Sequence, residues 1–202
     1  MIERLEQIAQ RPVSRETFEK LETYVGLLRE ESSRQNLISS ATLELVWDRH
    51  ILDSAQLATY EPRPGASWVD IGSGAGLPGI VIACLVEGPV TLVEPRRLRA
   101  EFLHKVSESL LLNVKIHCAK AERVSGSFDV ITARAVAPLD QLLKISAHLS
   151  TRNTVWALPK GRGAERELAE ARHTWQGDFR CVGSTSDDES LIVVAAGVRA
   201  RK

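Results

Sequence analysis

The sequence predicts an α/β protein with a mostly parallel, seven-stranded sheet, helices on both faces, a C-terminal antiparallel hairpin and an N-terminal helical extension. From residue 66 onward, short β-rich runs alternate with helical stretches, which is typical of βαβ units in a parallel sheet. The last two β-rich runs are separated only by a short polar segment, which predicts a hairpin. Before residue 60, apolar residues recur at helical spacing instead.

Residues 1–60 are therefore predicted to form a helical cap. A short helix is expected to end near Pro12, and Ser14 is placed to cap a second helix that runs to about Arg34. A third helical pattern begins at about Thr42 and continues to the end of the cap.

The two prolines and the glycine of residues 61–65 predict a linker, and residues 66–202 are expected to form the sheet domain, packed with the cap as one globular unit. The parallel strands are expected at 67–71, 90–94, 114–118, 128–132 and 154–158. The hairpin is expected from 179–183 and 190–198, with the turn at 184–189.

The composition is that of an ordinary globular protein, with 202 residues of which 44% are hydrophobic and 26% are charged. The three cysteines, Cys84, Cys118 and Cys181, are few and far apart, so we expect reduced, mostly buried thiols and no metal site. No segment approaches the ~20 apolar residues that span a bilayer, and no leader pattern is present. The sequence thus predicts a cytoplasmic protein without a membrane partner.

The formal net charge is zero, but residues 95–166 contain 13 Lys and Arg against 6 Asp and Glu, while the rest of the chain contains 13 against 20. A locally basic stretch can bind a polyanion such as a nucleic acid, because phosphate contacts depend on local charge. An ordinary solvated surface explains the same count, and charge alone does not decide between them.

The most informative segment is 68–80, WVDIGSGAGLPGI, in which an apolar strand reaches Asp70 and is followed by Gly72, Gly74 and Gly76. Glycines allow unusual backbone angles and close approach of a ligand, and Glu94 ends the next strand, where it can accept hydrogen bonds from a ribose. Together they predict a nucleoside-binding crevice. Residues 74–79 match the dinucleotide pattern GxGxxG, but the order DxGxGxG resembles motif I of class I, Rossmann-like S-adenosylmethionine methyltransferases.

The third strand leads into Ala121 and Glu122, on a loop that passes over the adenine in this architecture. Backbone groups of Ala121 and the carboxylate of Glu122 could read the edge of that base. A solvated surface glutamate is the other interpretation.

Five motifs, in order, are similar to one family in particular. They are NLIS at 36–39, RHILDS at 49–54, DIGSGAGLPGI at 70–80, TARA at 132–135 and PKGRG at 159–163. This set resembles the bacterial RsmG (GidB) family, guanine-N7 methyltransferases of 16S ribosomal RNA. One departure is ARAV at 133–136, where many members have SRAF.

The resemblance implies S-adenosylmethionine as cofactor and the small ribosomal subunit as partner. It further implies cofactor contacts by Gly72, Leu77, Ala121, Glu122 and Arg134, with Glu94 on the ribose. Arg134 follows the fourth strand, where it could hold the cofactor carboxylate, the RNA, or both.

The expected chemistry needs no general base. The Asn/Asp-Pro-Pro-aromatic motif typical of exocyclic-amine methylation is absent after the fourth strand, and guanine N7 has an unprotonated lone pair at neutral pH. Catalysis then reduces to alignment of donor and acceptor, so Arg134 and His50 are predicted to be positioning residues.

RNA contacts are expected from basic side chains. Those of the sheet domain could follow the phosphates, namely Arg96, Arg97, Arg99, Lys160 and Arg162, and two others approach from the helical cap, Arg49 and His50. The alternatives are a small-molecule methyltransferase, an NAD-dependent oxidoreductase and an RNA-binding module without catalysis. A monomer is expected.

Overall fold

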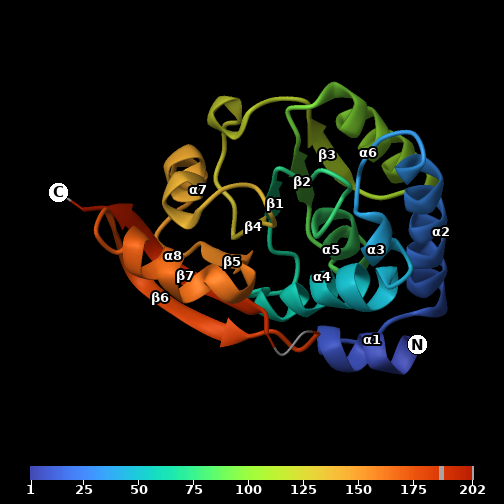
Figure 1. Cartoon of the computed structure of the whole chain (residues 1–202), viewed down its shortest axis with the longest axis horizontal. Coiled ribbons are helices and arrows are strands. Elements are labelled where there is room, and N and C mark those ends of the chain that lie inside the picture. Colours follow the sequence, from blue (N-terminus) through green and yellow to red (C-terminus); the bar gives the residue numbers. More distant parts are fainter. Residues whose placement is uncertain (187–188, 202) are drawn as a thin grey trace.

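A seven-stranded sheet forms the centre of the molecule, in a computed structural model that describes residues 1–186 and 189–201 (Figure 1). The strand order is β3-β2-β1-β4-β5-β7-β6. The bounds are β1 Trp68–Ile71, β2 Val90–Val93, β3 Val114–His117, β4 Val130–Ala133, β5 Val155–Pro159, β6 Trp175–Gly183 and β7 Leu191–Ala200. β1 to β5 are parallel, whereas β7 is antiparallel to both of its neighbours. The predicted sheet and C-terminal hairpin are confirmed, although residues 187 and 188 of the predicted turn lie outside the described residues.

Helices cover both faces of this sheet, because alternate side chains of each strand point to opposite faces. On one face lie α5 (Gly79–Leu85) and α6 (Arg97–Ser109), and on the other lie α7 (Leu139–Ser146) and α8 (Ala164–Ala171) (Figure 1). Trp68 of β1 packs in the apolar cluster under α5, and the next residue, Val69, packs in the cluster under α7. Short 3-10 turns follow β3, α7 and β5, at Ala121–Arg123, Ala147–Leu149 and Gly161–Gly163.

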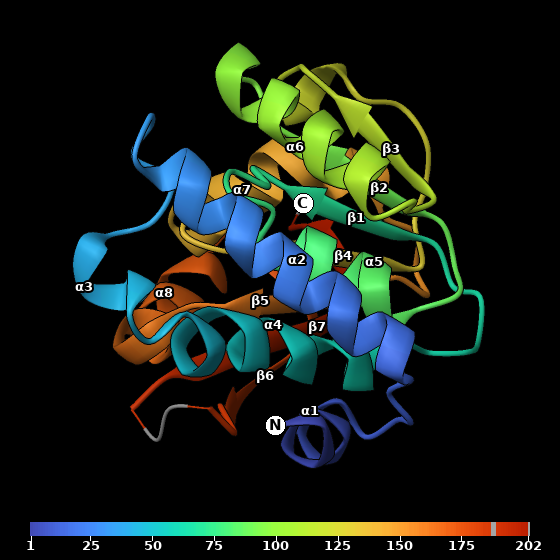
Figure 2. The same ribbon diagram turned by 90° about the vertical axis from the view of Figure 1, so that its right-hand side faces the viewer.

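The N-terminal helices add a further layer on the α5 face. α1 spans Ile2–Ala9 and α2 spans Arg15–Ser32, and α2 packs across α5 and α6 (Figure 2). The predicted cap of α2 is confirmed, because the Ser14 side chain accepts a hydrogen bond of 3.0 Å from the backbone N–H of Thr17. Leu21, Tyr24 and Leu28 of α2 are fully buried in the same apolar cluster as α5.

The third predicted helix is not one regular helix. It consists of α3 (Ser40–Leu43), a π-helical turn (Trp47–Leu52), α4 (Asp53–Ala55) and a 3-10 turn (Gln56–Tyr60). Nearly every residue from 51 to 58 is buried, so helical periodicity, which reports a single buried face, does not determine the helix type here. π-Helical turns are rare and are frequently found at functional sites. The segment does end at Tyr60, before the predicted linker.

The three cysteines are free. Cys84 and Cys181 are partly buried and Cys118 is exposed, so the expectation of mostly buried thiols is wrong at Cys118. Among the described residues, no helix is both long and apolar enough to cross a membrane. The same residues include no group of three His, Cys, Asp or Glu side chains that could hold a metal ion.

Candidate functional site

The candidate site lies at the carboxyl ends of the central strands. β1 pairs with β2 on one side and with β4 on the other. The chain runs outward from β1 to β3 on one side and from β4 to β5 on the other, so the topological switch lies between β1 and β4. In open α/β sheets, ligands bind in the crevice at this point.

The loop after β1 needs its glycines for two separate reasons. Gly72, Gly74 and Gly76 have positive φ angles of 68°, 56° and 97°, which L-residues with side chains rarely adopt. In addition, a Cβ atom on Gly72 would lie 2.6 Å from Cγ2 of Val136, and one on Gly76 would lie 2.6 Å from Cγ1 of Ile80. At Gly72 and Gly76 the loop therefore packs so closely against its neighbours that no residue with a Cβ atom would fit.

Asp70 lies beneath this loop and not on its surface. It is 1% exposed, accepts hydrogen bonds from the Gly79 backbone N–H (3.2 Å) and the Thr132 hydroxyl (2.9 Å), and thereby connects α5 and β4 to β1. Burial raises the pKa of Asp70 to about 6, and its hydrogen bonds oppose that shift. The structure places this predicted cofactor residue as a support of the loop.

Tyr24 holds the same loop from the N-terminal cap. Its hydroxyl donates a hydrogen bond of 2.9 Å to the carbonyl of Ala75, and its side chain is fully buried. Desolvation raises the pKa of Tyr24 far above its ordinary value, so the hydroxyl stays protonated and remains a donor. The cap therefore contributes directly to the position of the glycine loop.

Replacement of Tyr24 with Phe should weaken binding of a ligand that contacts the loop by about fivefold, because the change removes one buried hydrogen bond worth roughly 1 kcal/mol and keeps the ring packing. Calorimetry with S-adenosylmethionine below the melting transition measures this effect. Thr23→Val, on the exposed side of α2, is the control. A lower melting temperature with unchanged affinity would show that Tyr24 supports only the fold.

A cavity of about 330 Å³ opens beside the glycine loop. Four of the predicted cofactor residues line it, namely Gly72, Glu94, Ala121 and Glu122. Glu94 is 3% exposed and accepts hydrogen bonds from the backbone N–H groups of Gly74 (2.9 Å) and Arg96 (2.8 Å). A carboxylate has about four acceptor positions, so Glu94 retains capacity for the two hydroxyls of a ribose. Leu77 instead packs in the apolar core.

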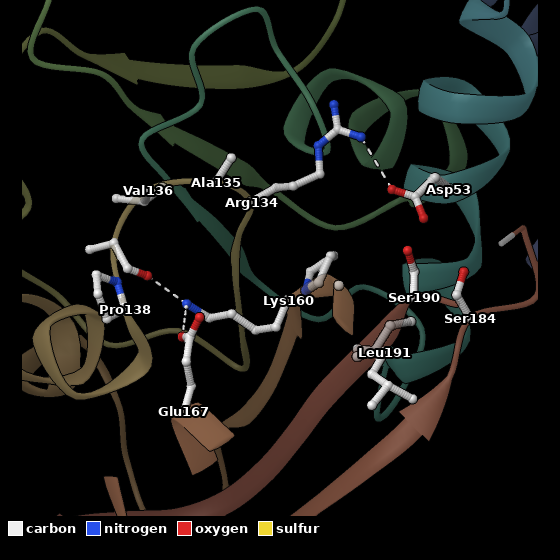
Figure 3. Close-up of a pocket in the computed structure, with 14 residues that line it drawn as sticks. Asp53, Arg134, Ala135, Val136, Pro138, Lys160, Glu167, Ser184, Ser190 and Leu191 are labelled. Atoms are coloured by element: carbon white, nitrogen blue, oxygen red, sulfur yellow. Dashed lines mark hydrogen bonds and ion pairs between the residues drawn. The ribbon is translucent and has the colours of Figure 1, made fainter. Parts of the chain in front are cut away.

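A second cavity has a volume of about 520 Å³, and Figure 3 shows its lining residues. It is bordered by the loop after β4, the end of β5 and the start of β7. Ala135 and Val136 line both cavities, so the two meet at this loop. Ala135 has a φ of 56°, an uncommon angle for a residue with a Cβ atom, which marks the loop as tightly constrained.

Arg134 links this loop to the cap (Figure 3). Its Nη1 lies 3.2 Å from Oδ2 of Asp53, and its Nη2 lies 3.1 Å from Nδ1 of His50. Asp53 also accepts hydrogen bonds from the Ser186 hydroxyl (2.9 Å) and the Gln56 amide (3.0 Å), which connects the network to the segment after β6. The predicted positioning residues, Arg134 and His50, are therefore in direct contact.

His50 is neutral in this network. Desolvation, followed by the charge of Arg134, lowers its pKa to about 4. Because Arg134 donates to Nδ1, the proton of the neutral ring is on Nε2, which lies 2.9 Å from the Thr42 hydroxyl. His50 thus orients Arg134 and carries no charge of its own at neutral pH.

His50 and Asp70 should have opposite effects on stability between about pH 4 and 6. The folded pKa of His50 lies below 6.5, so acidification through this range destabilises the fold. The folded pKa of Asp70 lies above 3.8, so acidification stabilises the fold. We therefore expect Asp70→Asn to lose more stability than wild type between pH 6.5 and 4.5 in urea denaturation. Equal losses in both proteins would contradict this assignment.

The predicted RNA-contacting residues divide into a group of arginines and a pair held by neighbouring residues, namely His50, which contacts Arg134 and Thr42, and Lys160. Arg49, Arg96, Arg97 and Arg162 are exposed, and Arg99 is partly buried beside the glycine loop. Lys160 differs, because its side chain is 8% exposed and its ammonium contacts Glu167 (3.0 Å) and the Ala137 carbonyl (2.5 Å). Lys160 lines the second cavity and is not available to follow a phosphate backbone.

Four residues with contacts at the site were not among those predicted from the sequence, namely Tyr24, Asp53, Gln56 and Glu167. Asp53 lies within the RHILDS motif, so the motif could have identified it as a site residue. Tyr24 lies on an apolar helix face and Glu167 in an ordinary charged helix. Only the three-dimensional contacts identify those two residues.

The hydrogen-bonding groups of the glycine loop and Glu94 fit S-adenosylmethionine better than a dinucleotide. The backbone N–H groups of Gly72, Ser73, Gly74, Gly76 and Leu77 all donate to protein acceptors, so the loop offers few of the donors that bind a pyrophosphate. The Gly79 N–H, at the start of α5, donates to Asp70. The close packing at Gly72 and the acceptor capacity of Glu94 suit a nucleoside with a slender tail.

Comparisons with known proteins agree with this geometry. The chain matches the GidB family model, described as rRNA small subunit methyltransferase G, over residues 17–186. It is 46% identical to the ribosomal RNA small subunit methyltransferase G of Zymomonas mobilis, over 94% of this chain and 90% of that protein. The protein of the same name from Rhizorhabdus wittichii is also 46% identical, over 94% of this chain and 89% of that protein.

Solved structures support the fold. A complex of MtNAS with S-adenosylmethionine has a TM-score of 0.59 at 18% identity, covering 88% of this chain and 74% of that chain. The ribosomal protein L11 methylase of Lactobacillus delbrueckii has a TM-score of 0.55 at 15% identity, covering 75% of this chain and 80% of that chain. The fold is therefore that of the class I methyltransferases, and the chain belongs to the rRNA small subunit methyltransferase G family.

Proposed function

We propose that this chain transfers a methyl group from S-adenosylmethionine to N7 of a guanine in 16S ribosomal RNA. The observation that carries the proposal is the junction of two cavities at Ala135 and Val136. One cavity has the acceptor chemistry for a nucleoside, and the other opens at the same loop, as transfer between two ligands requires.

Glu94 would hold the ribose of the cofactor, and Ala121 and Glu122 would contact its adenine. Asp70, Gly74, Gly76 and Leu77 would support the pocket from beneath, as residues of the loop or the core. When bound, S-adenosylmethionine supplies an electrophilic methyl group on its sulfonium. Arg134, which lines the second cavity and is held by Asp53 and His50, would orient the reacting groups.

No proton transfer by the protein is needed, because guanine N7 attacks with an in-plane lone pair. The neutral state of His50 agrees with a positioning role. The chain would then accelerate the reaction by alignment and by exclusion of water.

Phosphate contacts would come from the exposed arginines Arg49, Arg96, Arg97 and Arg162. Lys160 would instead support the loop after β4, because its ammonium holds the Ala137 carbonyl. We further propose that residues 1–60 act as a cap on the domain formed by residues 66–202, and that the enzyme acts as a monomer in the cytoplasm.

The test is incubation of unmodified small subunits, and separately of naked 16S RNA, with isotope-labelled S-adenosylmethionine, followed by mass-spectrometric mapping. Label at N7 of a single guanine supports the proposal. Free nucleotides serve as competing substrates. Label on the nucleotides but not on the RNA would favour a small-molecule methyltransferase.

A further inference from the structure

The second cavity has no excess of positive charge. Of its described lining residues, four are charged, and they form two pairs of opposite sign: Arg134 with Asp53 at 3.2 Å and Lys160 with Glu167 at 3.0 Å. A phosphate-binding site would need unpaired cations. The cavity is instead suited to a neutral, polar ligand, and its 520 Å³ falls within the range of small-molecule sites, roughly 300–1,000 Å³.

Two kinds of surface line this cavity (Figure 3). Val136, Pro138 and Leu191 supply apolar walls, while Ser184, Ser190, Lys160 and Glu167 supply polar groups. Apolar walls with a few convergent polar groups suit a planar base, whose faces pack against carbon while its edges form hydrogen bonds.

Glu167 has one occupied and one available carboxylate oxygen. Its Oε2 accepts hydrogen bonds from the Leu139 backbone N–H (2.7 Å) and from the Lys160 ammonium (3.0 Å). In the part of the chain that the structure describes, Oε1 accepts no hydrogen bond. Two contacts thus fix the carboxylate, and its second oxygen can accept from a ligand in the cavity.

We infer that this cavity receives the acceptor base and that Glu167 reads the N1–H and N2–H₂ edge of guanine, an inference that rests on the proposed function. Guanine is the only RNA base with two adjacent N–H donors on its Watson–Crick edge. A carboxylate oxygen accepts from these donors. N7 lies on the opposite edge of the purine, so recognition of the amino edge leaves N7 free to react.

The test compares guanine with inosine, which lacks the 2-amino group and keeps N7, at the methylated position of reconstituted small subunits. Wild-type enzyme should prefer guanine by about tenfold to a hundredfold in kcat/KM, because a hydrogen bond to a charged acceptor is lost with inosine. Glu167→Gln should reduce this preference to about threefold or less. Its single amide oxygen would already be occupied by Leu139 and Lys160.

Glu165→Gln is the matched control, because Glu165 is exposed on the same helix, α8, and should keep the wild-type preference. Equal rates of wild-type enzyme on guanine and inosine, or an unchanged preference in Glu167→Gln, would overturn the assignment. Loss of S-adenosylmethionine affinity in Glu167→Gln, measured by calorimetry, would overturn it as well. Absence of N7 methylation of either substrate by wild type would instead contradict the proposed function.

Discussion

Replacement of Arg134 with Ala is expected to reduce single-turnover methyl transfer about 100-fold, the effect of a misplacement of about 1 Å at a reacting centre. Arg134 contacts Asp53 and His50 and so fixes the loop at which the two cavities meet. The variant should also lose roughly 1–3 kcal/mol of folding free energy, because the largely buried Asp53 loses its charged partner. Quench-flow kinetics at saturating S-adenosylmethionine and urea denaturation measure the two effects.

Arg63→Ala is the control for this experiment. Arg63 also pairs with an aspartate, Asp129, but its side chain is 62% exposed, so its loss should cost little stability. Arg63 lines neither cavity, so activity should stay at the wild-type level. If Arg134→Ala turned over at the wild-type rate with wild-type cofactor affinity, Arg134 would have only a structural role.

Replacement of Glu94 with Gln is expected to weaken S-adenosylmethionine binding about tenfold to a hundredfold. The amide oxygen cannot accept from Gly74, Arg96 and a ribose together, and the amide nitrogen would face one of these donors. Because hydrogen bonds to a charged group are worth roughly 1.5–3 kcal/mol, the loss of one accounts for that factor. Calorimetric titration gives the dissociation constant directly.

Glu87→Gln provides the comparison for Glu94→Gln, since Glu87 is exposed shortly after α5. It should bind the cofactor as wild type does. Unchanged affinity in Glu94→Gln would remove Glu94 from the cofactor site. It would also show that the 330 Å³ cavity binds something other than the nucleoside.

Local pattern predicted the regular elements well, because each depends on short-range physics. Short continuous apolar runs predict β1, β2, β4 and β5, since a strand between two helical layers is apolar on both faces. Side-chain chemistry also predicted Ser14 as the N-terminal cap of α2 and the end of the N-terminal helical segment before the linker. The helix type of residues 47–60 was not, because a segment buried on all sides has no amphipathic period.

The candidate site was only partly available from sequence. The glycine loop and Glu94 follow from spacing along the chain, and Gly72, Glu94, Ala121 and Glu122 do line one cavity. Lys160 was expected at an open surface, but a basic residue in a glycine-rich motif does not reveal the glutamate that will pair with it. The pairing depends on α8 lying against the loop after β4.

The sequence by itself determined the fold class and the family and predicted a nucleoside crevice, because apolar runs, glycine spacing and motif order are properties of the linear chain. Only the tertiary structure decided which side chains share a cavity. Tyr24 and Ala75 are 51 positions apart, Asp53 and Arg134 are 81 apart, and both pairs form hydrogen bonds. Such contacts depend on how the cap packs on the sheet, and no local pattern encodes that packing.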